Sequence, residues 1–313
     1  MTIHSGLRPY RIFFRKCLSR ATCLALAVAV LATGTSGAAI AAPAGESVLE
    51  RIAQSGTLRA GTRSNAAPFA QRLATGGFEG FSVDLLEEIR RAAELAVGRP
   101  VTLRLSAVTP ADRLQQVAEA ELDIVCGITT PTWKREQQVD FSLPFFRDGT
   151  RVLVYREQAT KGQDLGQLTI GVVAGTTTVA IVKDRLPTAE LRVFHDMDDA
   201  MRGLAAAEVD GVANVGIVLL GLAERAEPRR SVVLLPRTGV LATEALACVL
   251  PQNDSAWRDL GNRTLVDLYA GVGDFGGRYV MLYERWFGRD GRIFYPLDRD
   301  TRDYLDGLSI WAR

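Results

Sequence analysis

The chain has 313 residues, with 37 Lys or Arg side chains and 36 Asp or Glu side chains. Five of the basic residues lie within the first 22 positions, and without them 32 basic residues stand against 36 acidic ones, a net charge of −4. That balance argues against a nucleic-acid-binding surface. The remaining length of about 270 residues allows one large domain or two ordinary domains, each with its own core.

The N-terminal 41 residues have the composition of a signal peptide. Five basic and no acidic side chains in residues 1–22 precede the apolar run CLALAVAVLA, and an Ala-Ile-Ala cleavage pattern ends at Ala41. This order predicts a cleaved signal peptide over residues 1–41 and export to the periplasm. The alternative is an uncleaved N-terminal anchor, although the apolar run is short for a membrane span.

Two of the four cysteines lie in the predicted signal peptide, so Cys126 and Cys248 remain in the mature chain. In an oxidising compartment an even pair of cysteines is most simply a disulfide. The alternative is two buried free thiols, and the separation of the two residues in the sequence does not decide between these possibilities.

The first half of the mature chain alternates between strand patterns and helix patterns. Strands are predicted at residues 58–61, 101–105 and 122–128. Between them, the spacing of apolar residues predicts helices at 80–96 and 113–120. This rhythm is typical of a parallel sheet covered by helices.

A second series begins with a strand over residues 150–155. Helices are predicted from residue 175, from residue 197, over 255–270 and around 279–288, and further strands at 168–173, 191–194, 209–215, 231–235 and 244–250. The tail at 294–311 is expected to pack on the outside. Because the rhythm restarts, the chain forms either two domains in tandem or two lobes between which it crosses twice, and the pattern alone leaves both open.

Polar side chains collect at the ends of several predicted strands, and in open α/β sheets ligands bind outside the carboxyl ends of the strands. Two arginines and a helix N-terminus suit an anion, since a guanidinium holds a carboxylate through two parallel hydrogen bonds. The structural alternatives are a surface ion pair for an arginine and helix caps for the threonines. The predicted ligand-binding residues are Arg63, Thr129, Thr130, Arg135, Gly175, Thr176, Thr177, Thr178 and Asn214.

Residues that would indicate catalysis or metal binding are sparse. His195 is the one histidine after the signal peptide, which makes neither a zinc site nor a convincing general base. The aspartates at 196, 198 and 199 lie at a predicted helix start, where acids favour the helix dipole. We therefore expect a protein that binds a small organic anion without a metal, a cofactor or a catalytic residue.

Five segments occur in order after the predicted signal peptide: GTRSNAAPF, GFSVDLLEEI, CGITT followed by an arginine and VDFS, GTTT, and ERWFG. In this set the chain resembles the periplasmic solute-binding proteins of polar amino-acid ABC importers, and it is similar above all to their glutamate/aspartate-binding branch. The resemblance covers nearly the whole mature chain. It implies a partner, the inner-membrane ABC transporter permease.

The resemblance also implies an α/β fold of the type II periplasmic-binding-protein class, with two lobes, two crossovers and a ligand cleft between the lobes. Lobe one would contain residues 46–146 and 245–313, and lobe two residues 149–242. Cys126 and Cys248 match strands that lie side by side in lobe one, so the resemblance implies a disulfide between them.

Roles for individual residues follow from the same resemblance. Thr130 and Arg135 match positions that hold the ligand's α-carboxylate, and Arg63 matches the arginine that reads the side-chain carboxylate. The aspartate that usually holds the α-ammonium falls on Val215, beside Asn214. An ammonium buried without an anion is costly, so either the ligand is an acid without a free amine, or Asn214 and carbonyl groups meet the ammonium.

The ligand is therefore expected to be either an acidic amino acid or an amine-free dicarboxylate or keto acid. Two alternatives belong to other classes. One is a cyclohexadienyl-dehydratase-like enzyme on the same fold, with Glu244 as its acid, because fold alone does not decide function. The other is a sensor lobe pair that serves a signalling partner.

Overall fold

The computed structural model describes residues 46–159, 164–226 and 230–312. The predicted signal peptide, residues 1–41, lies outside the described residues. Within them, no helix combines the length and the apolar composition that a membrane crossing requires.

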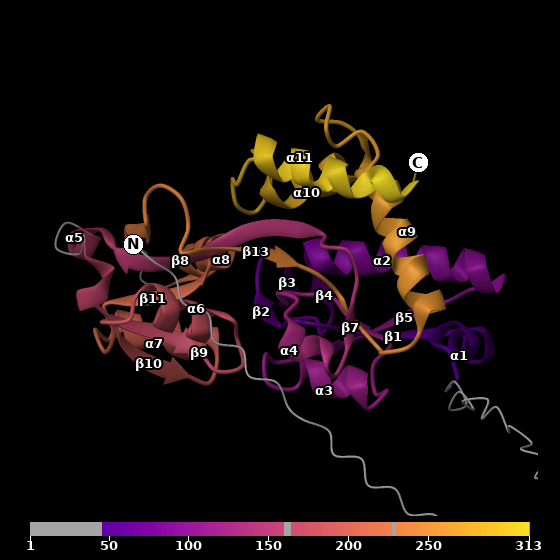
Figure 1. Ribbon diagram of the computed structural model, residues 1–313, viewed down its shortest axis with the longest axis horizontal. Coiled ribbons are helices and arrows are strands. Elements are labelled where there is room, and N and C mark those ends of the chain that lie inside the picture. The colour runs from indigo at the N-terminus through magenta and orange to yellow at the C-terminus, as the bar shows by residue number, and fades with distance from the viewer. Residues whose placement is uncertain (1–45, 160–163, 227–229, 313) are drawn as a thin grey trace, which may run out of the picture. The chain divides into compact units, whose positions relative to one another are not determined.

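Strand β1 (Thr57–Thr62) lies inside the five-stranded sheet of the first lobe (Figure 1). It pairs in parallel with β5 (Thr102–Ala107) and with β6 (Ile124–Val125), and antiparallel pairings extend the sheet through β14 (Val249–Leu250) to β7 (Asp140–Phe141). A small antiparallel sheet follows β1, made of β2 (Asn65–Ala66), β3 (Ala70–Arg72) and β4 (Phe78–Glu79). The helices of this lobe include α1 (Val48–Ser55), α2 (Phe81–Val97), α3 (Arg113–Ala118), α4 (Trp133–Glu136) and α9 (Ser255–Tyr269).

Helix α2 shows how the sequence specifies this lobe. Its residues Leu85, Leu86, Ile89 and Ala93 recur at three- and four-residue spacing and are all fully buried. The helix ends where Gly98 takes the left-handed conformation, with φ of 68°, and donates its N–H to the Glu94 carbonyl.

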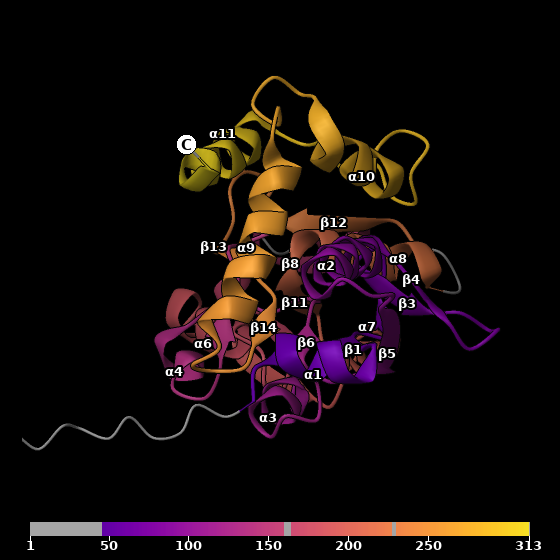
Figure 2. The ribbon, with the colours of Figure 1, turned by 90° about the vertical axis from the view of Figure 1, so that its right-hand side faces the viewer.

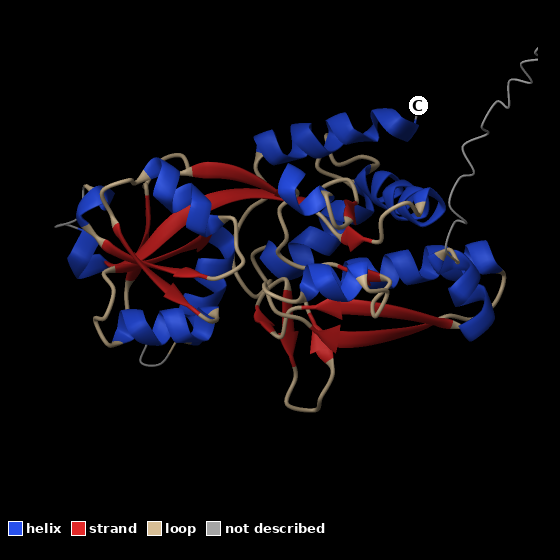
Figure 3. Cartoon of the chain, turned by 60° about the horizontal axis from the view of Figure 1, so that its bottom comes forward, coloured by secondary structure: helices blue, strands red, loops and turns tan. Residues whose placement is uncertain are grey.

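The second lobe is built on a sheet with helices packed around it (Figure 3). In spatial order its strands are β10 (Glu190–Phe194), β9 (Thr169–Val173), β11 (Gly211–Val215), β8 (Phe146–Tyr155) and β12 (Val232–Leu235), and β13 (Ala242–Leu246) also pairs with β8. Its helices are α5 (Arg156–Ala159), η1 (Leu165–Gln167), α6 (Thr178–Arg185), α7 (Met197–Ala205) and α8 (Gly216–Arg225).

The chain passes between the two sheets twice. Strand β8 begins at Phe146, soon after the first-lobe strand β7, and β13 pairs antiparallel with its first five residues (Figure 1). Three residues after the end of β13, the chain re-enters the first sheet as β14. The interlaced two-lobe fold implied by the resemblance is confirmed. The lobe boundaries stay a prediction, because β8 and β13 run across them.

One predicted element is wrong. The sequence predicts a single strand over residues 244–250, whereas the structure has β13 and β14, which belong to different sheets. Ala247 and Cys248 lie between the two strands and are fully buried. Strands buried on both faces give a continuous apolar run, so the pattern does not mark the point at which the chain changes sheet.

The C-terminal segment adds three helices: α10 (Gly277–Phe287), α11 (Arg299–Leu308) and η2 (Ser309–Ala312), and α10 and α11 lie beside α9 (Figure 2). Phe287 of α10 meets Phe69, Phe81 and Phe146 in a cluster of fully buried rings, with centroids 4.8–6.1 Å apart. These separations suit edge-to-face and tilted packing. The cluster fixes the start of β8, because Phe146 is its first residue.

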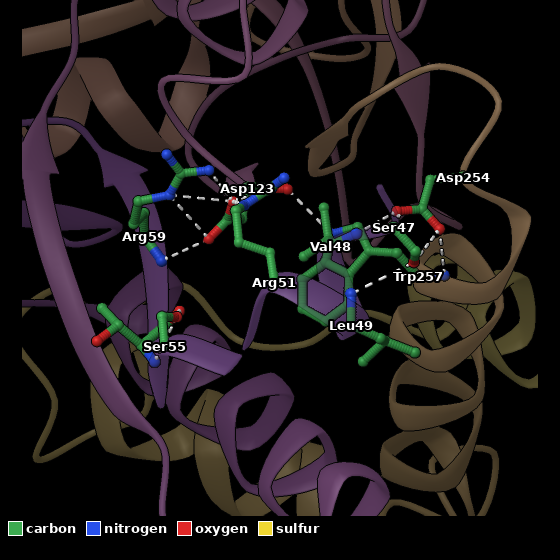
Figure 4. Close-up of polar contacts among 10 residues, drawn as sticks. Ser47, Val48, Leu49, Arg51, Ser55, Arg59, Asp123, Asp254 and Trp257 are labelled. Atoms are coloured by element: carbon green, nitrogen blue, oxygen red, sulfur yellow. Dashed lines mark hydrogen bonds and ion pairs between the residues drawn. The ribbon is translucent and has the colours of Figure 1, made fainter. Parts of the chain in front are cut away.

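A buried aspartate, Asp123, joins α1, β1 and α9 (Figure 4). Asp123 is fully buried and accepts hydrogen bonds from the backbone N–H of Arg59 at 2.8 Å and from the guanidinium groups of Arg59 and Arg51. Its backbone carbonyl accepts the indole N–H of Trp257 at 2.9 Å. Because the charge is paired and several donors reach it, its burial is compensated.

A disulfide joins Cys126 and Cys248, both fully buried, which confirms the pairing that the resemblance implies. Cys126 follows β6, and Cys248 lies between β13 and β14. Thr62 donates its hydroxyl to the Cys126 carbonyl at 2.9 Å, and Ser142 accepts the Cys248 N–H at 2.9 Å. The disulfide therefore holds the segment after β6 next to the end of β13, the strand on which the chain returns to the first lobe.

Replacing both cysteines, as Cys126→Ala with Cys248→Ala, is expected to lower the free energy of unfolding by about 3 to 5 kcal/mol. The two residues are 122 positions apart, and a cross-link over so long a loop strongly restricts the unfolded chain. Urea unfolding followed by circular dichroism measures the change. A midpoint equal to that of the oxidised wild-type protein would contradict this expectation.

Candidate ligand-binding site

A polar cleft lies where the strand ends of the two lobes face each other. Its empty volume is about 500 Å³, a value that includes space open to solvent. The lining residues of the first lobe are Arg63, Asn65, Ala66, Pro110, Arg113, Ile128, Thr130 and Arg135. Those of the second lobe are Val173, Thr176, Thr177, Thr178, Met197, Asn214, Val215 and Val218. The crossover strand β13 contributes Glu244.

Most of the predicted site residues are brought together in this cleft. Thr129 and Gly175 are the two that do not line it. Thr129 is fully buried, and its carbonyl accepts the N–H of Ala247 at 2.9 Å. Gly175 lies at the edge, where its carbonyl accepts a hydrogen bond from Arg135. The residues that do line the cleft are Arg63, Thr130, Arg135, Thr176, Thr177, Thr178, Asn214 and Val215.

Arg63 follows β1 and is buried. One nitrogen of its guanidinium donates to the side-chain oxygen of Asn65 at 3.0 Å, and its Nε has no hydrogen-bond partner among the described residues. Burial lowers the pKa of Arg63, while the carboxylates of three nearby aspartates act in the opposite direction. The guanidinium therefore keeps donor capacity that the protein does not use.

Arg113 is a charged residue of the cleft that the sequence did not predict. It is the first residue of α3, its exposed fraction is 3%, and within the described chain its side chain makes no hydrogen bond or ion pair. Burial, together with the positive charges of Arg135 and Arg63, lowers its pKa to about 9. It still carries a proton at neutral pH, so it is a buried cation without a protein partner.

The sequence signal for Arg113 is weak. The helix that it begins follows β5, so Arg113 comes after a strand of the first sheet, as Arg63 does. A charged residue at the start of a short amphipathic helix is usually solvent-exposed, however, and nothing in the local pattern indicates that this one points into a cleft.

Arg135 spans the cleft from α4. Its guanidinium donates to the Thr130 carbonyl at 2.6 Å in the first lobe and to the Gly175 carbonyl at 3.0 Å in the second. Burial lowers the pKa of Arg135, and the Glu244 carboxylate raises it. Arg135 is therefore placed to contact both lobes and an anion between them.

Glu244 is the acid of the cleft, and threonines surround its carboxylate. Thr130 of the first lobe and Thr177 of the second donate their hydroxyls to the same oxygen, Oε2, at 2.7 and 2.5 Å, and Thr150 of β8 donates to Oε1. Glu244 is 3% exposed. This network joins the first lobe, the second lobe and the crossover strands at one carboxylate.

The position that would hold an α-ammonium carries no charge. Val215 precedes α8 without capping it, and Asp148 of β8 instead accepts the Ile217 N–H at 2.8 Å. Asp148 does not line the cleft. Among the described lining residues the charges are three arginines and one glutamate, which gives a net charge of +2.

Two α/β lobes that share two crossover strands and meet at a polar cleft define the two-lobed, type II class of solute-binding proteins. Residues 58–289 match the bacterial extracellular solute-binding proteins, family 3. The chain belongs to that family.

Similar proteins include both binders and an enzyme. The L-glutamate/L-aspartate-binding protein of Pseudomonas aeruginosa is 26% identical over 273 residues, which cover 84% of this chain and 88% of that protein. The cyclohexadienyl dehydratase of the same species is 28% identical over 188 residues, which cover 58% of this chain and 64% of that enzyme. Among solved structures, an ancestral amino acid-binding protein that is a precursor of cyclohexadienyl dehydratase superposes with a TM-score of 0.66 at 26% identity, over 77% of this chain and 100% of that chain.

Replacing the buried cation, as Arg113→Met, is expected to have opposite effects on binding and on stability. Binding of an anionic ligand should weaken at least 30-fold, because a desolvated charge contact is lost. The ligand-free protein should become more stable, because an unpaired buried charge is replaced by an apolar side chain of similar length. Calorimetry measures the first effect and thermal unfolding without ligand the second.

The matched control is Arg104→Met, which removes an exposed arginine of β5 outside the cleft. It should change neither quantity. If Arg113→Met leaves the affinity unchanged, Arg113 has no part in the ligand site.

Proposed function

We propose that this protein is the periplasmic substrate-binding component of an ABC importer for an acidic amino acid or a related small carboxylate. The observation that carries the proposal is the pair of buried guanidinium groups, Arg63 and Arg113, which retain donors without a protein partner in the described cleft. Buried polar groups are normally satisfied, so unused cationic donors in a cleft point to an anionic ligand. The glutamate/aspartate-binding relative supports the same class.

Location and partner follow from the family and from the N-terminal sequence. The predicted signal peptide over residues 1–41 would deliver the chain to the periplasm. There, a solute-binding protein hands its ligand to an inner-membrane ABC transporter permease. We propose that permease as the partner, and the small organic anion as the cargo.

The charge of the cleft favours a ligand with two carboxylates and no amine. A dianion balances the net charge of +2 on the lining residues, whereas a zwitterionic acidic amino acid, with a net charge of −1, leaves one positive charge uncompensated. Val215 offers an ammonium no anion, and the carboxylate of the cleft, Glu244, already accepts three threonine hydroxyls, so an unpaired ammonium would be costly to bury. An amine-free dicarboxylate is therefore the finer proposal, and an acidic amino acid is the alternative.

We propose binding without catalysis, although an enzyme is among the relatives. Glu244 is the cleft acid, and three threonine hydroxyls donate to its carboxylate. It is thus arranged as an acceptor and not as a proton donor to a substrate. His195 has a side chain that is 82% exposed and does not line the cleft.

Titrations of matched pairs test the ligand class. Succinate should bind at least as tightly as aspartate, and glutarate at least as tightly as glutamate, in calorimetry at low ionic strength. Thermal shift gives an independent readout, because a ligand at a hundred times its dissociation constant adds about 2.7 kcal/mol to stability. Amino acids that bind more than tenfold tighter, about 1.4 kcal/mol, would mean that the ammonium has a partner in the cleft.

A variant sharpens the comparison. Val215→Asp places a carboxylate in the cleft, so it should shift the preference towards aspartate and glutamate by at least tenfold. It would repel a second carboxylate and attract an ammonium. The matched control is Val193→Asp on the exposed face of β10, outside the cleft, which should leave the preference unchanged.

A further inference from the structure

Three of the four threonine hydroxyls that line the cleft give their protons to acceptors of the protein. A threonine has one hydroxyl proton and two acceptor lone pairs, and an ionised carboxylate can only accept. Thr130 and Thr177 therefore give their protons to Oε2 of Glu244. Thr176 gives its proton to the carbonyl of Val173 at 2.7 Å. What these three hydroxyls can offer a ligand is lone pairs.

Each amide side chain of the cleft uses its oxygen and one of its two N–H groups within the protein. Asn65 donates to Asp198 at 2.8 Å and accepts from Arg63. Asn214 donates to the sulfur of Met197 at 3.0 Å and accepts the Val215 N–H at 2.8 Å. Side-chain donors in the described cleft are thus mainly the guanidinium groups, with a second N–H on each amide, and the hydroxyls of Thr130, Thr176 and Thr177 are acceptors. The Thr178 hydroxyl makes no hydrogen bond to another described residue.

The two hydroxyls on Glu244 lie close to each other. Both bond the same carboxylate oxygen, one from each lobe, and both line the cleft beside Arg135. A ligand whose carboxylate meets Arg135 therefore brings the neighbouring carbon to acceptors supplied by both lobes. A hydrogen-bond donor on that carbon would be satisfied there.

We infer that the ligand is a 2-hydroxy dicarboxylate, and that Glu244 sets this preference by fixing Thr130 and Thr177 as acceptors. The inference rests on the proposed function, since it names the substrate class of the same site. A hydroxyl supplies the missing donor without adding charge, so the two carboxylates still balance the net charge of +2. An ammonium also donates, but it reduces the ligand charge to −1 and meets no carboxylate at Val215.

Keto acids and unsubstituted dicarboxylates fit this arrangement less well. A 2-oxo group presents only lone pairs to the lone pairs of Thr130 and Thr177, and a methylene group leaves those lone pairs without a donor. Sites that hydrogen-bond a substrate hydroxyl reject analogues without it, because buried polar groups are then unpaired. The orientation of these two threonine hydroxyls thus distinguishes 2-hydroxy dicarboxylates from oxo and unsubstituted dicarboxylates, which the sequence alone groups together.

Calorimetry with acids of one carbon skeleton tests the inference. The five-carbon probes are 2-oxoglutarate, glutarate and both enantiomers of 2-hydroxyglutarate. The four-carbon probes are succinate and both enantiomers of malate. One enantiomer of a hydroxy acid is expected to bind at least tenfold tighter than the oxo or unsubstituted acid of the same length. If 2-oxoglutarate or the unsubstituted acids bind equally well or better, the inference is overturned and the proposed function stands. If no dicarboxylate or acidic amino acid binds at millimolar concentration, both are overturned.

Two variants connect the preference to Glu244. In Glu244→Gln the new carboxamide can donate a hydrogen bond to a threonine hydroxyl, and that hydroxyl can then direct its own proton into the cleft. The ratio of hydroxy-acid affinity to oxo-acid affinity should therefore fall at least fivefold. Thr177→Val removes one acceptor and should weaken hydroxy-acid binding more than glutarate binding. Thermal unfolding checks that each variant is folded. If Glu244→Gln does not fold, the result for Thr177→Val decides the test.

The matched control is Thr264→Val, which removes a part-buried threonine hydroxyl on α9, where it donates to the Leu260 carbonyl at 2.9 Å outside the cleft. It should leave the ratio unchanged. Unchanged ratios in Glu244→Gln and Thr177→Val as well would overturn the role assigned to Glu244.

Discussion

The pairing of β8 with β13 is the constraint on which the rest of the molecule depends. These two strands carry the chain from one lobe to the other and back, and their register places Glu244 directly opposite Asp148. Residues opposite each other in an antiparallel pair lie on the same face, and like charges in that arrangement are destabilising. The crossover therefore needs separate donors for two neighbouring acids.

The structure supplies those donors from different elements. Glu244 accepts hydrogen bonds from threonine hydroxyls of both lobes. Asp148 instead accepts the Tyr295 hydroxyl at 2.9 Å and the backbone N–H of Ile217 in the first turn of α8. Burial raises the pKa of Asp148, and the hydrogen bonds from Ile217, Tyr295 and Gly149 oppose that rise. One acid thus faces the ligand site and the other anchors a helix. Because Asp148 accepts the Ile217 N–H, the side chain of residue 215 need not cap α8, and an apolar residue can stand there.

Concentrating three arginines in a small cleft is unfavourable for the empty protein. Each guanidinium loses hydration on burial, and Arg113 has no hydrogen bond or ion pair among the described residues to offset that loss. Binding sites often retain such local strain while the rest of the fold is well packed. Here the surrounding structure includes the cross-link at Cys126 and the aromatic cluster around Phe146. An anionic ligand would relieve the strain, so part of its binding free energy comes from the protein itself.

Much of the architecture could be predicted from local patterns, because strands and helices leave a period in the apolar residues. Arg63, Thr130 and Arg135 follow predicted strands, and all three line the cleft. The split between β13 and β14 could not be predicted, because both strands are buried and their apolar run is continuous. Helix α11 was expected only as packed tail, since its apolar face is narrow and its composition is highly polar.

Arg113 and the Glu244 network were beyond sequence reasoning for another reason. Both depend on side-chain directions across elements that are far apart in the chain: Glu244 is 114 residues from Thr130 and 67 from Thr177. Periodicity carries no information on such contacts. Which hydroxyl gives its proton to which oxygen becomes visible only when all three segments are placed together.

The hydrogen bond from Tyr295 to Asp148 bears on where this chain can be cut. The match to the family ends at residue 289, yet Tyr295 lies beyond it, as do Ile293, Leu297 and Leu305, which are all buried. A version trimmed to the shared span would lose a donor at the crossover and part of the packing beside α9. The limit of family likeness is thus not the limit of the folding unit, and expression or fusion boundaries belong after α11.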